Sequence, residues 1–129
     1  MPCRTAAAFI AAPSASLVQG SAANSAQILH AHDLSGALPA LATLRTNPGA
    51  VLLYDSHEVF LESGRWVKSP TFIRRILADR FEQPALRRAA ALIAVNPQVI
   101  EELAKRYEIP ERQVVTYNCP PAWNPEPRG

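Results

Sequence analysis

The stretch AVLLYDSHEVF, residues 50–60, decides the fold. Its first half is continuously apolar rather than alternating, which is typical of a parallel strand that helices cover on both faces. Asp55, Ser56, His57 and Glu58 then follow at once, without a glycine or proline to mark an ordinary turn. In open parallel α/β sheets, ligands bind beyond the carboxyl ends of the strands. The stretch therefore predicts a buried strand that delivers polar residues into a ligand site.

Strands and helices alternate on both sides of this stretch. Asp33 and Asn96 are predicted to cap the helices that follow them, and Pro84 should break or kink a helical segment. Strands separated by helices imply right-handed crossovers, so we predict an α/β fold with a Rossmann-like, doubly wound parallel sheet flanked by helices. Besides residues 50–55, the predicted strands are 27–32, 91–95 and 114–118, and the predicted helices are 34–45, 71–83, 84–90 and 97–107.

Three segments differ from this alternating pattern. Residues 1–26 are rich in Ala, Ser and Pro and show little periodicity, so we expect a poorly ordered leader without a strand. Residues 59–70 are expected to form a long exposed loop that carries Trp66. Residues 122–129 are a Pro-rich tail, which leaves residues 27–121 as the predicted α/β domain.

Composition excludes several classes of function. The 129 residues suit one domain, and a net charge of +2 is too small to indicate nucleic-acid binding. Cys3 and Cys119 lie far apart without metal-ligand spacing, as expected for a reduced, intracellular protein. No apolar run approaches the roughly 20 residues of a membrane span. We therefore expect a cytoplasmic protein.

Missing motifs narrow the chemistry further. The sequence has no G-x-G-x-x-G after a strand and no G-x-x-x-x-G-K-[ST], which disfavours dinucleotide and P-loop enzymes. It also lacks the G-x-S-x-G turn that carries a nucleophilic serine.

The histidines allow three interpretations. In a metal site, His30 and His32 would share one face of a strand and would be joined by His57 with Asp33 or Asp55. In acid–base or electrostatic catalysis, His57 would act with a pKa near neutrality, oriented by Asp55 or Glu58. In a purely structural interpretation, Asp33 is a helix cap, His30 a hydrogen-bonded strand residue and Glu58 a solvated acid.

Four segments together resemble a known family. They are ILHAHDLSGALPAL, VLLYDSHEVF, LRRAAALIAVNPQVIEELAKRY and VVTYNCP, and their order and spacing resemble the N-terminal domain of family 4-like glycosyltransferases, which have the GT-B fold. The resemblance runs from Gln27 to Pro121. It implies transfer of a sugar from a nucleotide-sugar co-substrate to a glycan or lipid-linked acceptor, with no other cofactor and no metal ligand.

The resemblance also implies roles for individual residues. His57 matches the family's active-site histidine. His32 and Asp33 match the strand-end pair near the same crevice, and Asn118 matches the residue that leads into the interdomain connection. The remaining substrate-binding residues, which would shape the site, are Asp55, Ser56 and Glu58.

The family's architecture has further implications. Its members bind the nucleotide-sugar on a second domain, so the resemblance implies an incomplete half that is active only with a donor-binding domain. That domain could be a partner chain, and a homodimer along an exposed sheet edge is a further possibility. Trp66 and Lys68 fall where the family contacts its acceptor. The basic helix at 71–81 is a solvated face, a contact with an anionic acceptor, or a peripheral contact with the inner, anionic face of a membrane.

Two alternatives from other classes stay open at this point. One is a non-catalytic module that binds a glycan or a partner chain. The other is a metal-dependent hydrolase that uses His30, His32 and His57.

Overall fold

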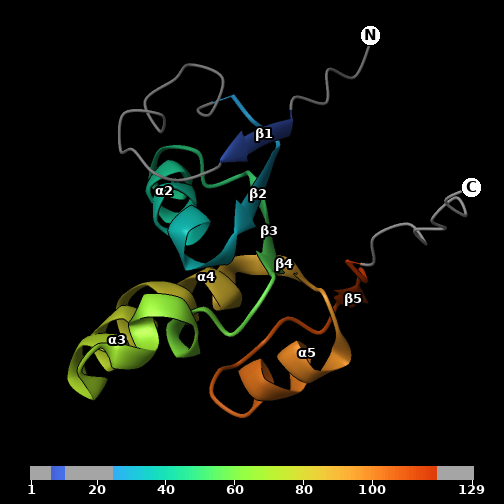
Figure 1. Cartoon of the computed structure of the whole chain (residues 1–129). Helices are drawn as coiled ribbons and strands as arrows, with labels where there is room; N and C mark the ends of the chain where they lie inside the picture. The colour runs from blue at the N-terminus through green and yellow to red at the C-terminus, as the bar shows by residue number, and fades with distance from the viewer. Residues whose placement is uncertain (1–6, 11–24, 119–129) are drawn as a thin grey trace, which may run out of the picture.

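The computed structural model describes residues 7–10 and 25–118, and Figure 1 shows the arrangement of their helices and strands. The described strands form one sheet in which all neighbours are parallel and the strand order follows the chain. The strands are β1 Ala7–Ile10, β2 Ile28–His32, β3 Val51–Ser56, β4 Ala89–Ala94 and β5 Gln113–Val115.

Helices connect the strands from β2 onward. This confirms the predicted α/β, Rossmann-like parallel sheet flanked by helices. The connection from β2 to β3 is α2 Asp33–Thr46, and that from β4 to β5 contains α5 Pro97–Ala104. Between β3 and β4 lie η2 Phe60–Glu62, η3 Gly64–Lys68, α3 Thr71–Leu77, η4 Ala78–Glu82 and α4 Gln83–Arg88.

The expectation that no strand precedes residue 27 is wrong for Ala7–Ile10. This segment forms β1 and pairs with β2 from Ala7 opposite Ile28 to Ile10 opposite Ala31. Four residues in an Ala-rich segment are too few to show the sequence pattern of a strand. β1 forms because its backbone can pair with the exposed edge of β2. Residues 1–6, 11–24 and 119–129 lie outside the described residues, so the domain limits at 26 and 121 stay predictions.

The two faces of the sheet differ in burial. On one face Leu29, Leu52, Tyr54 and Leu92 are buried in the core, and α2 and α4 contact each other and the strands on this side (Figure 1). The alternate residues of the same strands face the other way, and Ile28, His30, Leu53 and Ile93 are only partly buried. The prediction of a doubly wound sheet covered on both faces is therefore wrong for the described strands. Right-handed crossovers that always add the next strand in the same direction place their helices on one side.

The segment from Thr71 to Arg88 is one helical run. Pro84 begins a second helical piece, as predicted: it lies in the first turn of α4, where a missing N–H is least costly, and the π-helical turn η4 separates α4 from α3 without ending the helical run. The apolar side of α3 is largely exposed: Phe72 is 65% and Ile76 is 53% exposed. Amphipathic spacing predicted the helix but not the side on which it would pack.

Residues 59–70 are also more structured than expected. They form the 3-10 turns η2 and η3, and Trp66 is partly buried against the core, with its ring 6.1 Å from that of Phe60. The prediction of an exposed loop is therefore wrong at Trp66, whereas Lys68 is exposed.

A buried carboxyl group joins three parts of the fold. Glu82 in η4 is 1% exposed, and its two oxygens accept hydrogen bonds from the Tyr54 hydroxyl at 3.1 Å and the Tyr107 hydroxyl at 2.7 Å. Burial raises the pKa of Glu82, and the two hydrogen bonds oppose this in part. The network fixes the helical run against β3 and against the segment after α5.

We predict that Glu82 makes stability depend on pH. Its folded pKa lies above the ordinary value of 4.5, so the folded state holds the proton more tightly than the unfolded state. Its contribution is fully present below the unfolded pKa and is lost as pH rises through the folded pKa. As pH rises from the unfolded pKa to the folded pKa of Glu82, the unfolding free energy of Glu82→Gln should therefore increase relative to that of wild type, by about 1.4 kcal/mol per pH unit.

Urea unfolding between pH 4 and pH 8 measures this difference. The exposed Glu101→Gln serves as the control for the removal of one carboxylate. A difference from wild type that varies with pH no more for Glu82→Gln than for Glu101→Gln would contradict the assignment.

Candidate functional site

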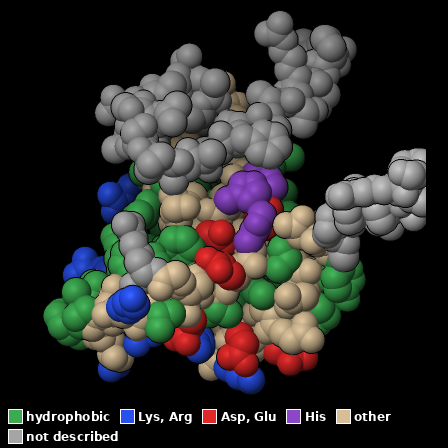
Figure 2. Space-filling model, in the orientation of Figure 1, with side chains coloured by type: hydrophobic (Ala, Val, Ile, Leu, Met, Phe, Trp, Pro, Cys, Tyr) green, Lys and Arg blue, Asp and Glu red, His purple; other side chains and the backbone are tan. Residues whose placement is uncertain are grey.

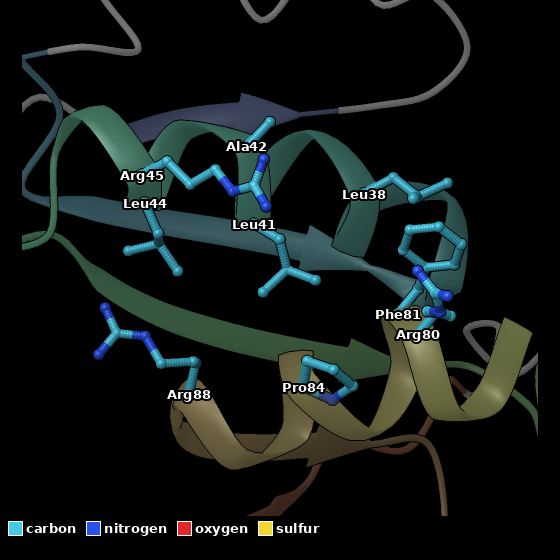
Figure 3. Close-up of a pocket in the computed structure, with 9 residues that line it drawn as sticks. All are labelled: Leu38, Leu41, Ala42, Leu44, Arg45, Arg80, Phe81, Pro84 and Arg88. Carbon is cyan, nitrogen blue, oxygen red and sulfur yellow. The ribbon is translucent and has the colours of Figure 1, made fainter.

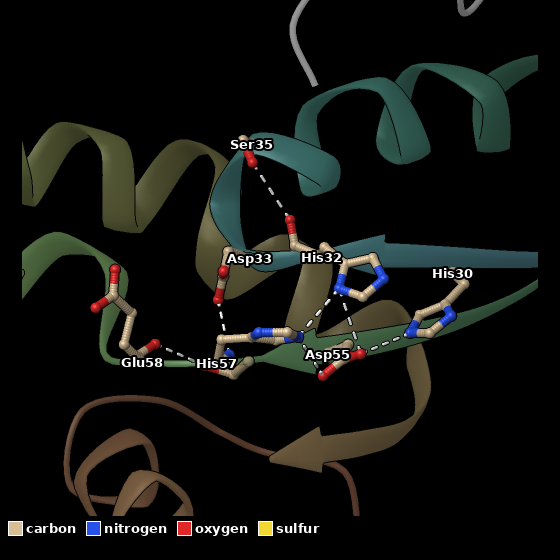
Figure 4. Close-up of polar contacts among 8 residues, drawn as sticks. His30, His32, Asp33, Ser35, Asp55, His57 and Glu58 are labelled. Carbon is tan, nitrogen blue, oxygen red and sulfur yellow. Dashed lines mark hydrogen bonds and ion pairs between the residues drawn. The ribbon is translucent and has the colours of Figure 1, made fainter. Parts of the chain in front are cut away.

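The register between β2 and β3 brings the predicted polar residues together. His32 lies opposite Asp55, and His30 lies opposite Leu53. Because residues two apart on a strand point to the same face, His30, His32 and Asp55 all lie on the half-exposed face of the sheet. His57 follows the end of β3 and reaches the same place (Figure 4).

Asp55 is the centre of this group, which we call the histidine cluster: His30, His32, Asp55 and His57. One carboxylate oxygen, Oδ2, lies 2.9 Å from His30 Nε2 and 3.4 Å from His32 Nδ1. The other oxygen, Oδ1, lies 3.5 Å from His57 Nε2, and His32 Nδ1 and His57 Nε2 are 3.3 Å apart. The His30 and His32 rings stack with centroids 4.5 Å apart.

Burial differs across the histidine cluster. Asp55 is buried, whereas the side chain of His57 is 46% exposed. A buried carboxylate requires donors, and the imidazole N–H groups around Asp55 are suited to supply them. The cluster is thus anchored in the sheet at Asp55 and open to solvent at His57. Figure 2 shows the histidine side chains gathered in one place, with acidic side chains beside them.

Asp33 fixes the backbone that carries His57. Its Oδ1 accepts a hydrogen bond from the His57 backbone N–H at 3.0 Å. The predicted N-cap role of Asp33 is wrong, because His32 occupies the N-cap position and Asp33 lies inside α2 with a φ of +50°. Asp is one of the few residues that tolerate this left-handed conformation. Burial raises the pKa of Asp33, and the hydrogen bond from His57 partly counteracts this.

Ser56 and Glu58 shape the turn around His57. The Ser56 side chain is buried on the other side of β3 from Asp55, and its hydroxyl donates to the Glu58 carbonyl oxygen at 2.8 Å. The residue Glu58 is exposed. The structure thus brings His32, Asp55 and His57 into direct contact, whereas the Ser56 side chain lies on the opposite face of β3.

The two predicted asparagines have different positions. Asn96 caps α5 as expected, because its Oδ1 accepts from the Val99 backbone N–H at 3.0 Å. Asn118 is exposed and follows β5. β5 is the second strand from β3 in the sheet, and at the usual spacing the two strands are about 10 Å apart. Within the part of the chain that the structure describes, no contact joins Asn118 to the histidine cluster.

A separate groove of about 530 Å³ lies between α2 and the run from η4 to α4 (Figure 3). Apolar side chains such as Leu41 and Phe81 line it together with three arginines, and no member of the histidine cluster contributes to it. It depends on the packing of two helices far apart in sequence, so the sequence alone did not indicate it. The arginines are Arg45, Arg80 and Arg88.

Comparison with known families decides the class of this chain. A family model described as "Glycosyl transferase 4-like domain" matches residues 2–119. The chain belongs to this family. Comparison with curated proteins and with solved structures gives no significant match.

Membership confirms the resemblance drawn from the four sequence segments. The match to the glycosyl transferase 4-like domain also includes β1, which lies before the four segments that carry the resemblance. No helix among residues 25–118 is long and apolar enough to cross a membrane.

Proposed function

We propose that this glycosyl transferase 4-like chain is the acceptor-side half of an enzyme that transfers a sugar from a nucleotide-sugar donor to a glycan or lipid-linked acceptor. Family membership supports the transferase class. One observation supports the location of the site: His57 is exposed at the carboxyl end of β3, with its backbone held by Asp33 and its ring held by Asp55 and His32.

The proposed chemistry assigns His57 the contact with the donor sugar. An imidazole held in one orientation donates a hydrogen bond to a sugar hydroxyl without a further ordering cost. In its protonated form it stabilises negative charge that develops as the nucleoside diphosphate leaves, and Asp55 stabilises the imidazolium. His32 Nδ1 contacts the same ring nitrogen, Nε2, at 3.3 Å and restricts the ring further.

The donor half belongs to a second domain in this proposal. That domain binds the nucleotide, either on a partner chain or beyond Asn118, and closes over the carboxyl ends of the strands. Lys68 on the exposed turn after Trp66 is then placed toward the acceptor. The transfer itself requires no metal ion.

The first test of this proposal is sugar transfer. The chain is assayed with UDP- and GDP-sugars, with and without a separately expressed donor-binding domain. We expect turnover only in the presence of that domain. His57→Ala should lower kcat by about 10²–10³-fold, the usual cost of removing one preorganised donor.

The control is Glu111→Ala, an exposed change just before the amino end of β5, at the opposite edge of the sheet, that should leave turnover unchanged. Turnover that is equal in His57→Ala and wild type would contradict the proposed role of His57. Binding of a glycan by the folded chain without transfer in any format would instead identify the non-catalytic binding module.

We also propose that α3 contacts an anionic membrane surface near a lipid-linked acceptor. Phe72 and Ile76 expose apolar side chains on α3, and Val67 on the preceding turn is 55% exposed. Arg75 on the same helix is well exposed. Exposed apolar groups flanked by cationic ones are suited to insert at the boundary between headgroups and acyl chains of anionic lipids.

Vesicle co-sedimentation tests this contact. Wild type should bind vesicles that contain phosphatidylserine, and the Phe72→Ser/Ile76→Ser double variant should bind about tenfold less or worse, because two apolar side chains no longer enter the bilayer. Val114→Ser removes an exposed apolar group from β5 and should have no effect. Equal binding by the double variant and wild type would rule out α3 as the contact.

A further inference from the structure

The groove between α2 and the run from η4 to α4 is separate from the histidine cluster. Its lining residues come from the helices that cover one face of the sheet, whereas the histidine cluster lies on the other face. The volume of the groove is about 530 Å³, within the roughly 300–1,000 Å³ that is usual for small-molecule sites. The groove therefore has the size of a site for one small molecule.

The inner surface of the groove is apolar. Leu41 on α2 and Phe81 on η4 are only partly buried against the core, and Leu38 is 42% exposed. Figure 3 shows the Leu41 and Phe81 side chains between the two helices. Apolar surface that stays in contact with water gains free energy when an apolar group covers it. The groove thus favours a ligand with an apolar part.

The groove is long and narrow. From Leu38 to Arg45 it follows seven residues of α2, which is about 10 Å at the rise of an α-helix. α2 contacts both η4 and α4, so the space left between them is narrower than the roughly 10–12 Å that a helix with its side chains needs. An extended alkyl chain fits this shape, whereas a helix of a partner protein does not.

The charged side chains that line the groove are all basic: Arg45, Arg80 and Arg88. Among the described residues, none of the three forms an ion pair with a carboxylate, and Arg88 donates to the Pro48 carbonyl oxygen at 3.5 Å. An arginine in the last turn of a helix offsets the helix dipole, which explains Arg45 and Arg88 singly. It does not explain three arginines around one apolar groove, which are complementary to an anionic ligand.

Arg45 and Arg88 are placed to hold the anionic group. They lie in the last turns of α2 and α4, on opposite walls of the groove, and Figure 3 shows both toward the same end. A guanidinium group binds phosphate oxygens through two parallel N–H···O bonds. Arg80 lies toward the other end, beside Phe81 (Figure 3).

We propose that the groove binds one anionic membrane lipid, with an acyl chain along Leu41 and Phe81 and with the phosphate between Arg45 and Arg88. The exposed apolar side chains of α3 belong to the same helical run, so a membrane against α3 is the source of this lipid. The groove contains no residue of the histidine cluster, and the proposal does not rest on sugar transfer.

The test separates the chain of the lipid from its charge. The full protein, purified without detergent, is titrated by calorimetry with decyl phosphate below its critical micelle concentration. Decyl maltoside supplies the same chain with an uncharged head, and inorganic phosphate supplies the charge without the chain. We expect one decyl phosphate per protein chain and at least tenfold weaker binding of each of the other two compounds, because each lacks one of the two contacts.

Variants locate the site. Ala42 is exposed and lines the groove, so Ala42→Trp should fill the groove and lower the affinity for decyl phosphate more than tenfold, whereas Ala104→Trp at an exposed position on α5 should not. Arg45→Gln/Arg88→Gln should also lower the affinity more than tenfold. Arg87→Gln/Arg112→Gln removes the same charge from exposed positions outside the groove and should leave the affinity unchanged.

Three results would overturn the proposal, provided that circular dichroism shows folded protein. The first is the absence of decyl phosphate binding. The second is equal affinity for decyl phosphate and either of the other compounds, which would indicate a site for the anion alone or for the chain alone. The third is equal affinity in Ala42→Trp and Ala104→Trp, which would place the lipid elsewhere.

Discussion

The parallel register of β2 against β3 is the constraint on which the candidate site depends. It places His32 opposite Asp55, and a slip of one residue would turn His30 and His32 to the face that the helices cover. The buried side chains of Leu29 and Leu52, which lie opposite each other in this register, oppose such a slip. The same hydrophobic pattern that builds the core thus determines which polar atoms meet on the other face.

The two buried carboxyl groups of Glu82 and Asp55 have different surroundings. Glu82 lies on the helix-covered side, where two tyrosine hydroxyls donate hydrogen bonds to it and only 1% of it is exposed. Asp55 lies on the other face, where imidazoles surround it and one of them is open to solvent. The first arrangement suits a structural anchor. The second suits a site, because a ligand can reach the groups that Asp55 orients.

Much of the fold followed from the sequence. The apolar run at 50–55 and the alternation of strands with helices correctly predicted a parallel α/β sheet, and Asn96 was correctly predicted as a cap. These features are local or periodic, so a single sequence carries them. Strand β1 was missed because four residues gain their structure from pairing with β2. The exposed apolar side of α3 was missed because spacing cannot tell which face a helix buries.

The site was predictable in its location but not in its contacts. Strand-end position singled out His32, Asp55 and His57, which are in contact in the structure. The role of Asp33 was misjudged, because its hydrogen bond joins residues 24 positions apart and depends on a left-handed backbone that the sequence does not reveal. The Glu82 network also joins distant segments, and a glutamate in an amphipathic helix gives no sign of burial.

The most direct test of the account is the long-range ¹H–¹⁵N correlation spectrum of the imidazole side chains. The chain has three histidines, so each ring is assigned by one substitution. If Asp55 is their common centre, Asp55→Asn will shift the ring nitrogen signals of all three histidines, whereas Asp79→Asn will shift none. Histidine signals that are unchanged in a folded Asp55→Asn variant would contradict the existence of the cluster.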